Sequence, residues 1–174
     1  MPFLMIRNDI TNVAADAIVN PANRNLLQGS GTSRAIYQAA GEQELTAACE
    51  AIGYCEPGRA VCTPAFGLPA KYIFHAVCPA WHGGFFGEAK QLAGAYHSAL
   101  ELAAEYHCES VAFPQRQALV KTPGAIHPGC QCRHRRSFRT AAQKLLRYAK
   151  AYSCRRLRSN LHGQHPRQPP RYPC

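Results

Sequence analysis

Short apolar runs alternate with longer segments of helical periodicity through the first 114 residues of this 174-residue chain. Runs of four to eight apolar residues between turn signals predict strands at residues 3–7, 16–20, 59–64, 71–77 and 110–113. Apolar positions that recur every three or four residues predict helices at residues 32–38, 44–52 and 87–107. Strands that alternate with helices predict a three-layer α/β domain.

The first predicted helix has recognisable ends. Thr32 or Ser33 offers a side chain that can cap its N-terminus. Ile36 and the alanine pair 39–40 form its inner face, and Gly41 ends it. The strand before it, residues 16–20, is apolar enough for both of its faces to be buried.

The pattern stops after Pro114, and the charge changes at the same point. Residues 1–114 hold all ten acidic residues and six of the twenty basic ones, whereas residues 115–174 hold fourteen basic residues and no acid. A single folded domain rarely changes composition so abruptly. We therefore expect an α/β core at 1–114 and a basic, Arg/Pro-rich tail at 115–174, largely disordered.

Cysteine usage and hydropathy bear on the compartment. The chain has nine cysteines, an odd number, and its N-terminus turns polar after six residues, which does not fit a secretory segment. No run approaches the roughly 18–20 apolar residues that span a bilayer. We expect a cytoplasmic protein that does not enter a membrane.

Polar residues with ligand-binding chemistry cluster between residues 9 and 41. Asp9 follows the first predicted strand, where a carboxylate can accept a hydrogen bond from an exocyclic amine; the alternative is that it begins a turn with Asn12. Asn23, after the next strand, has an amide that can contact ribose hydroxyls, whereas Asn20 would tie down loop backbone. An ordinary Asn/Pro turn is the alternative for this segment.

A Gly29-Ser30-Gly31 turn precedes the helix that begins near Thr32. Glycines permit close backbone approach, and the free N–H groups at a helix N-terminus favour phosphate. The turn is not the dinucleotide fingerprint, because Arg34 stands at the third glycine position, and it lacks the Gly-Lys-Ser/Thr of a P-loop.

In order and spacing, the Asp-Ile-Thr at residue 9, the Asn-Pro-Ala-Asn ending at Asn23 and the glycine turn resemble the start of a macrodomain. The resemblance covers residues 3–114 and implies a three-layer α/β/α mixed sheet that recognises ADP-ribose or an ADP-ribosylated molecule, without a cofactor or metal. It implies that the adenine lies at Asp9 and Ile10, and the distal ribose at Asn23. The pyrophosphate would lie on Gly29, Ser30, Gly31, Thr32 and Ser33.

The resemblance also bears on catalysis. Many hydrolytic macrodomains carry an Asp at the position of Ser33, where it orients or activates the attacking water. A serine hydroxyl is a poor general base. Hydrolysis of ADP-ribosyl or O-acetyl-ADP-ribosyl esters would assign catalytic roles to Asn23 and Ser33 and would require a further water-activating group. His75 is expected to be a satisfied core histidine of its strand.

The family's second glycine loop should follow Pro114, but residues 115–120 do not match it, so the C-terminal elements are atypical or missing. Three explanations compete for residues 115–174. One is a reading-frame change, which we hypothesise. Another is a basic extension that binds nucleic acid, with its binding weakened by salt. The third is a metal site at Cys130, Cys132 and His134, although its spacing does not match structural zinc sites.

The reading-frame hypothesis predicts that another frame of the gene encodes the missing glycine loop directly after the codon for Pro114. Sequencing the locus and translating all frames tests this. If no frame encodes a Ser-x-Gly-x-Tyr/Phe-Gly segment there, residues 115–174 are a genuine extension.

Overall fold

The computed structural model describes residues 4, 6–80, 82 and 85–114, all of which belong to one unit of the chain, Met1–Arg133. A short 3-10 helix, η1 (Ile10–Asn12), precedes the first strand. The strands are β1 (Ala15–Ala22), β2 (Ala60–Pro64), β3 (Ala70–Val77) and β4 (Val111–Ala112). The helices are α1 (Thr32–Ala40), α2 (Glu42–Ile52) and α3 (Glu88–Glu105).

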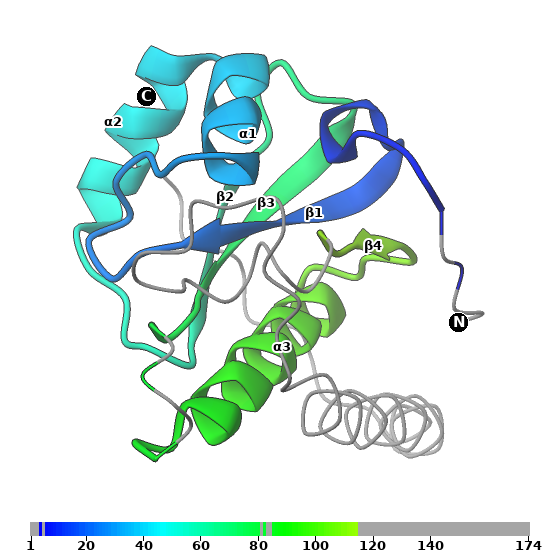
Figure 1. Cartoon of the computed structure of the whole chain (residues 1–174). Helices are drawn as coiled ribbons and strands as arrows, with labels where there is room; N and C mark the ends of the chain where they lie inside the picture. The colour runs from blue at the N-terminus through cyan, green and yellow to red at the C-terminus, as the bar shows by residue number, and fades with distance from the viewer. Residues whose placement is uncertain (1–3, 5, 81, 83–84, 115–174) are drawn as a thin grey trace. The chain divides into compact units, whose positions relative to one another are not determined.

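The four strands form one mixed sheet in the order β2-β3-β1-β4 (Figure 1). β1 runs parallel to β3 from the pair Ala15/Ala70 to the pair Ala22/Val77, and it also runs parallel to β4. β2 is antiparallel to β3. The parallel strands therefore end at the same edge of the sheet, which is where ligands bind in open α/β sheets.

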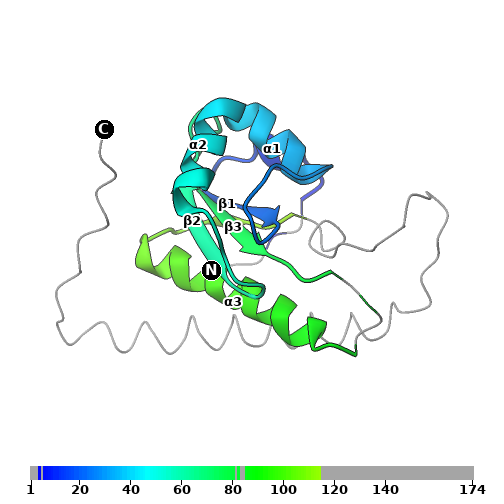
Figure 2. The ribbon, with the colours of Figure 1, turned by 90° about the vertical axis from the view of Figure 1, so that its left-hand side faces the viewer.

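Helices cover both faces of the sheet, with α1 and α2 on one side and α3 on the other (Figure 2). Each strand supplies alternate residues to the two cores. Ile18, Ile73 and Val77 pack with Ile36 and Leu45 beneath α1 and α2. On the α3 side the core includes Ala17, Val19, Phe74, Leu92, Ala95 and Ala99. The three-layer α/β/α mixed sheet predicted from the sequence is confirmed.

β1 is buried on both faces, as its composition predicts. Ala17, Ile18, Val19 and Asn20 are each at most 1% exposed. Pro21 lies near the end of this strand, although proline cannot donate a ladder hydrogen bond. It pairs with Ala76 of β3 but lies beyond the described pairing with β4, which ends at Ile18.

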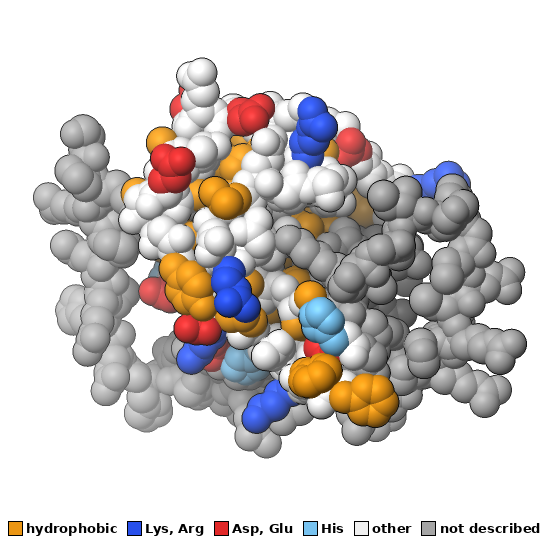
Figure 3. Space-filling model, turned by 60° about the vertical axis from the view of Figure 1, so that its left-hand side comes forward, with side chains coloured by type: hydrophobic (Ala, Val, Ile, Leu, Met, Phe, Trp, Pro, Cys, Tyr) orange, Lys and Arg blue, Asp and Glu red, His pale blue; other side chains and the backbone are white. Residues whose placement is uncertain are grey.

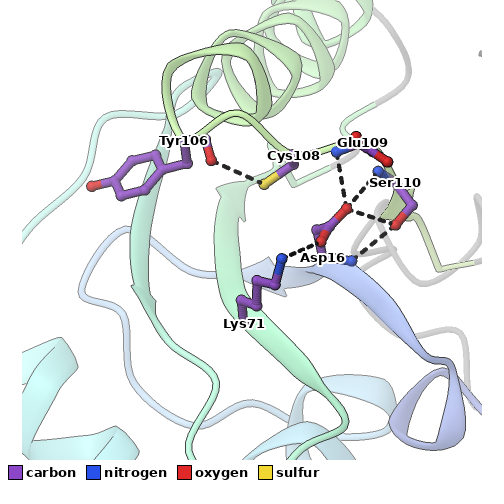
Figure 4. Close-up of polar contacts among 6 residues, drawn as sticks. All are labelled: Asp16, Lys71, Tyr106, Cys108, Glu109 and Ser110. Atoms are coloured by element: carbon purple, nitrogen blue, oxygen red, sulfur yellow. Dashed lines mark hydrogen bonds and ion pairs between the residues drawn. The ribbon is translucent and has the colours of Figure 1, made fainter. Parts of the chain in front are cut away.

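A carboxylate holds the start of β1 against the start of β4 (Figure 4). Asp16 accepts hydrogen bonds from the backbone N–H groups of Glu109 and Ser110 and from the Ser110 hydroxyl, and it forms a 2.8 Å ion pair with Lys71. The Lys71 ammonium, followed by the Ser110 and Glu109 donors, holds the pKa of Asp16 well below its usual range. The carboxylate is therefore ionised near neutral pH and holds the starts of the two strands together.

Most of the helices and strands predicted from the sequence are present in the structure, but some predictions are wrong. The helices and four of the five strands are present. The strand predicted at residues 3–7 is wrong for the part described, because residues 4, 6 and 7 lie in no strand and Leu4 is 77% exposed. Ala39 is exposed rather than on the inner face of α1. The predictions for residues 115–174 lie outside the described residues.

The helix cap predicted at Thr32 or Ser33 is also wrong. The N-cap residue of α1 is Gly31, which has no side chain to accept a hydrogen bond, and Thr32 is already the first helical residue. The N-terminal N–H groups of α1 are thus left without a side-chain cap, which matters for the loop that precedes the helix.

Gly94 allows α3 to pack closely on the turn at Gly58, before β2, and we predict that Gly94→Ala destabilises the fold. A Cβ at this position would lie 2.8 Å from the carbonyl oxygen of Gly58, whose own N–H is bonded to Val77 O. We expect the free energy of unfolding, measured by urea denaturation, to fall by about 1–3 kcal/mol from overpacking. Helix propensity alone predicts the opposite sign, a gain of about 1 kcal/mol. A more stable variant would therefore contradict this packing.

Candidate ligand-binding site

The candidate site centres on the β1–α1 loop, residues 23–31, which leaves the carboxyl end of β1 (Figure 1). Asn23 organises its first turn. The Asn23 side-chain oxygen accepts hydrogen bonds from the backbone N–H groups of Asn25 and Leu27, at 3.1 Å each, and its amide donates to Leu27 O at 2.7 Å. A short polar side chain that bonds to nearby backbone in this way is typical of an Asx turn.

These contacts limit what Asn23 can offer a ligand. Its oxygen already accepts two hydrogen bonds, and one of its two amide hydrogens is donated to Leu27 O. One N–H therefore remains for a ligand. In this conformation Asn23 can donate to a ribose oxygen, but its oxygen has no free lone pair with which to hold a water molecule.

A side chain of α1 fixes the middle of the loop by a hydrogen bond. Leu26 is 1% exposed and has a φ of 55°, a left-handed conformation that is uncommon for a leucine. Its carbonyl oxygen accepts a hydrogen bond from the Tyr37 hydroxyl at 2.5 Å. Near it, Arg24 O accepts the N–H of Cys55 at 2.9 Å. The loop is thus fixed to α1 and to the segment after α2.

Gly29 and Ser33 meet where the loop enters α1. The Ser33 hydroxyl accepts the backbone N–H of Gly29 at 3.2 Å, and Ser33 is 3% exposed. A Cβ on Gly29 would lie 3.2 Å from the Ser33 Cβ, so glycine is the residue that fits here. Within the described residues no basic group lies within hydrogen-bonding distance of this hydroxyl, which leaves Ser33 without the partner that activates a serine.

Gly31 gives the loop an open donor surface. Its φ of 58° and ψ of −126° are accessible mainly to glycine, and a Cβ at this position would meet nothing within 4 Å. The first helical hydrogen bond runs from Ala35 N to Gly31 O, so the N–H groups of Thr32, Ser33 and Arg34 precede the α-helical ladder. Such N–H groups, at the positive end of the helix dipole, form a surface suited to an anion.

Asp9 lies at the start of η1, which packs against α1. Its Oδ1 accepts hydrogen bonds from the N–H and the hydroxyl of Thr11, so Asp9 caps the 3-10 turn. Among the described residues its Oδ2 has no partner, and the backbone N–H of Thr11 lowers the pKa of the carboxyl. Asp9 therefore begins a turn, as the alternative interpretation expected, and its Oδ2 remains available as an acceptor. Ile10 is half-buried against the core.

A row of buried polar side chains crosses the sheet beneath α1 and α2. Asn20 Nδ2 lies 3.0 Å from His75 Nδ1, and Thr63 Oγ1 lies 2.9 Å from His75 Nε2. Burial lowers the pKa of His75 to about 4, so the ring is neutral near pH 7. This confirms His75 as a satisfied core histidine.

The role predicted for Asn20 is wrong. Its amide contacts His75 in the sheet and does not tie down loop backbone; Asn23 does that instead. Asn20 is 1% exposed, and within the described part of the chain its Oδ1 has no hydrogen-bond partner. Spacing alone did not distinguish the two asparagines, because Asn20 lies inside β1 and faces His75, whereas Asn23 lies just after the strand and folds back on its own loop.

The structure thus brings Asn23, Gly29, Ser30, Gly31, Thr32 and Ser33 into one loop and helix start. Tyr37 was not singled out from the sequence, although a tyrosine on the inner face of an amphipathic helix usually has a partner for its hydroxyl. Across residues 4–114 as described, no cluster of three or more His, Cys, Asp or Glu could hold a metal ion, and the five cysteines are free thiols. No described helix is long and apolar enough to cross a membrane.

Comparison with known proteins identifies the family. The sequence model of the family described as "Macro domain" matches residues 19–120, more than half of the chain. The chain is 49% identical over 109 residues to the macro domain-containing protein CT2219 of Chlorobaculum tepidum, covering 63% of each chain. It is 48% identical over 114 residues to the O-acetyl-ADP-ribose deacetylase of Klebsiella pneumoniae, covering 63% of this chain and 65% of that protein. The chain belongs to the macrodomain family.

Solved structures agree on the fold. The Oceanobacillus iheyensis macrodomain with ADP superimposes with a TM-score of 0.57 at 35% sequence identity, over 62% of this chain and 60% of that one. The chain spans slightly less than two thirds of the length of the curated relatives named above. The family resemblance seen in the sequence is confirmed, and it is confined to the N-terminal part of the chain.

The neutral, buried His75 predicts that stability falls in mild acid. Its pKa is lower in the folded protein, about 4, than the usual 6.5, so the unfolded chain binds the extra proton between these values. The free energy of unfolding should therefore fall as the pH drops from 6.5 towards 4, by about 2 kcal/mol between pH 7 and pH 5 from this residue.

Urea denaturation at pH 7 and pH 5 measures this effect, and His75→Gln supplies the comparison. We expect the variant to be less stable at pH 7 and to lose about 2 kcal/mol less than the native protein on acidification. Equal losses in both proteins would show that His75 does not carry the dependence.

Proposed function

We propose that this macrodomain recognises ADP-ribose or an ADP-ribosylated molecule. The observation that carries the proposal is the β1–α1 loop, in which Gly31 leaves open space in front of uncapped N–H groups at the start of α1. A diphosphate is the kind of group that such a donor surface accommodates without a countercharge. The names of the relatives support the choice of ligand, since one is an O-acetyl-ADP-ribose deacetylase and a structural neighbour holds ADP.

Each part of the ligand has a candidate partner. The free Oδ2 of Asp9 can accept a hydrogen bond from the exocyclic amine of adenine. The half-buried Ile10 follows Asp9 in the chain. The pyrophosphate would lie on the N–H groups from Gly29 to Ser33. Asn23 would donate its remaining N–H to an oxygen of the distal ribose.

Hydrolysis of an ADP-ribosyl or O-acetyl-ADP-ribosyl ester is the finer proposal. It would use Asn23 and Ser33 near the reacting bond. The Asn23 oxygen is already occupied by two backbone N–H groups, and the Ser33 hydroxyl accepts from Gly29, so neither side chain is arranged as a general base. We therefore propose recognition as the primary activity, with turnover dependent on substrate phosphate or a further group to activate water.

Nucleic-acid binding by the basic residues 115–174 is the rival function, and these residues lie outside the described part of the chain. On the face drawn in Figure 3, acidic and basic side chains of the described residues are scattered and form no continuous basic patch. Calorimetry with ADP-ribose and with single-stranded RNA at two salt concentrations separates the two functions. Binding to nucleic acid should weaken steeply with salt.

The donor surface at Gly31 predicts a specific loss of affinity in Gly31→Ala. The added methyl group would stand in the open space proposed for the pyrophosphate, and the positive φ would be strained for alanine. We expect the Kd for ADP-ribose, measured by calorimetry, to rise at least about tenfold.

Gly87→Ala is the matched control. Gly87 is the N-cap of α3 and has a φ of 76°, and a methyl group added there would likewise meet nothing within 4 Å. Its left-handed conformation, with a ψ of 16°, is less costly for alanine than that of Gly31, and this variant should leave the Kd within about twofold. If both variants weaken binding equally, or if neither does, the pyrophosphate does not lie on Gly31.

A further inference from the structure

We propose that Tyr37 is a positioning residue for the β1–α1 loop, and that its hydroxyl, seated by the Cys49 thiol, holds the loop in the shape that receives the ligand. The inference rests on the proposed function, because the ligand in question is the diphosphate assigned to this loop. Tyr37 does not contact that ligand in the proposal. It acts through the Leu26 carbonyl.

The hydroxyl lies between two partners from different elements. Tyr37 Oη is 2.5 Å from Leu26 O and 3.2 Å from Cys49 Sγ. A hydroxyl has one hydrogen, and the carbonyl can only accept, so that hydrogen is donated to Leu26. The Cys49 thiol can then donate its own hydrogen to Oη. A residue of α1 thereby binds the Leu26 carbonyl, and a residue of α2 supports that contact.

The Leu26 carbonyl has a strong requirement for this donor. Tyr37 and Leu26 are each 1% exposed, so water does not replace the hydroxyl. A buried carbonyl without a partner loses the hydrogen bonds that water would supply and gains none in their place, which is unfavourable. Leu26 also has a left-handed backbone conformation, with a φ of 55°, which persists only where neighbouring contacts hold it. Both features mark this peptide as one that the surroundings fix in place.

The Tyr37 hydroxyl keeps its hydrogen near neutral pH. Burial, and then the neighbouring Cys49, raise the pKa of Tyr37 well above its usual range. Burial likewise raises the pKa of the Cys49 thiol. Both groups are therefore neutral hydrogen-bond donors. The hydrogen bond from Tyr37 to Leu26 O does not depend on pH near neutrality.

Tyr37 and Cys49 also contact the sheet, through His75 of β3. Cys49 Sγ lies 3.8 Å from His75 Nε2, and the Tyr37 and His75 rings form a T-shaped pair with centroids 6.4 Å apart. His75 is in turn hydrogen-bonded between β1 and β2 through Asn20 and Thr63. The loop carbonyl is thus tied to the most buried part of the sheet, so its position is set by rigid elements.

Tyr37→Phe tests the proposal in the full chain, with calorimetry of ADP-ribose binding as the first measurement. The substitution removes one oxygen and keeps the ring. We expect the Kd to rise about tenfold, the change that corresponds to loss of one buried hydrogen bond. Tyr72→Phe is the matched control, because Tyr72 is half-buried on the opposite face of the sheet with Phe74 and Tyr106. It should leave the Kd within about twofold.

Amide hydrogen exchange supplies a second measurement that needs no ligand. We expect exchange to accelerate in Tyr37→Phe at the N–H groups of Leu27 and Cys55, which are bonded to the loop, and to stay unchanged there in Tyr72→Phe. If Tyr37→Phe does not fold, Cys49→Ala keeps the hydroxyl and removes the thiol that seats it. For that variant we expect a smaller rise in Kd, about threefold, with the same exchange pattern.

The outcomes distinguish this inference from the proposed function. If the native chain binds ADP-ribose and Tyr37→Phe binds it equally well, Tyr37 does not position the site. If the native chain does not bind ADP-ribose, the proposed function fails, and exchange at Leu27 and Cys55 still decides whether Tyr37 holds the loop. Unchanged exchange in both Tyr37→Phe and Cys49→Ala would overturn the inference whatever the ligand.

Discussion

The parallel pairing of β1 with β3 is the constraint on which the rest of the described structure depends. It runs from Ala15/Ala70 to Ala22/Val77 and directs both strands to the same edge of the sheet. Alternate residues of the two strands build the cores beneath α1 and α2 and beneath α3. A shift of one residue would exchange these two sets, so the register that forms the cores also fixes where the β1–α1 loop leaves the sheet.

Polar residues inside this pairing add specificity to it. In the same register Asn20 lies opposite His75, and Thr63 reaches the other nitrogen of the ring from β2. A shifted strand would leave these groups buried without partners, which is costly. Among the buried side-chain nitrogen and oxygen atoms of the described residues, Asn20 Oδ1 is the one without a hydrogen-bond partner, so this arrangement is not fully satisfied.

Much of the fold could be predicted from the sequence because its elements are long and regular. The apolar run of β1 and the three-to-four-residue spacing in α3 each determine a structure by local pattern. Residues 3–7 have a similar apolar pattern, but a strand also needs a neighbouring strand to pair with. The hydrophobic pattern of a segment does not show whether such a neighbour exists. Leu4 and Ile6 are 77% and 61% exposed in the structure.

The candidate site was predictable in kind and less so in detail. The glycine turn before α1 and Asn23 after β1 indicated a phosphate and ribose site from residue chemistry, which remains a proposal. Which asparagine supports the loop could not be predicted, because Asn20 points beneath α1 while Asn23 folds back on its own turn. Tyr37 was missed for the same reason: its partner, Leu26 O, is eleven residues away and meets it only in the folded loop.

These contacts suggest how a macrodomain of this kind obtains affinity. The groups that would contact the proposed ligand are an acceptor at the start of η1, Asp9, and donors from the β1–α1 loop and the first turn of α1. When a site makes few contacts, its affinity depends strongly on how much conformational entropy the protein loses when it binds the ligand. The loop is already held by Asn23 at its start, by the Cys55 N–H at Arg24, and by Gly29 and Ser33 at its end. Because its N–H groups are already oriented, the free energy gained from the proposed diphosphate would not be consumed in ordering the loop.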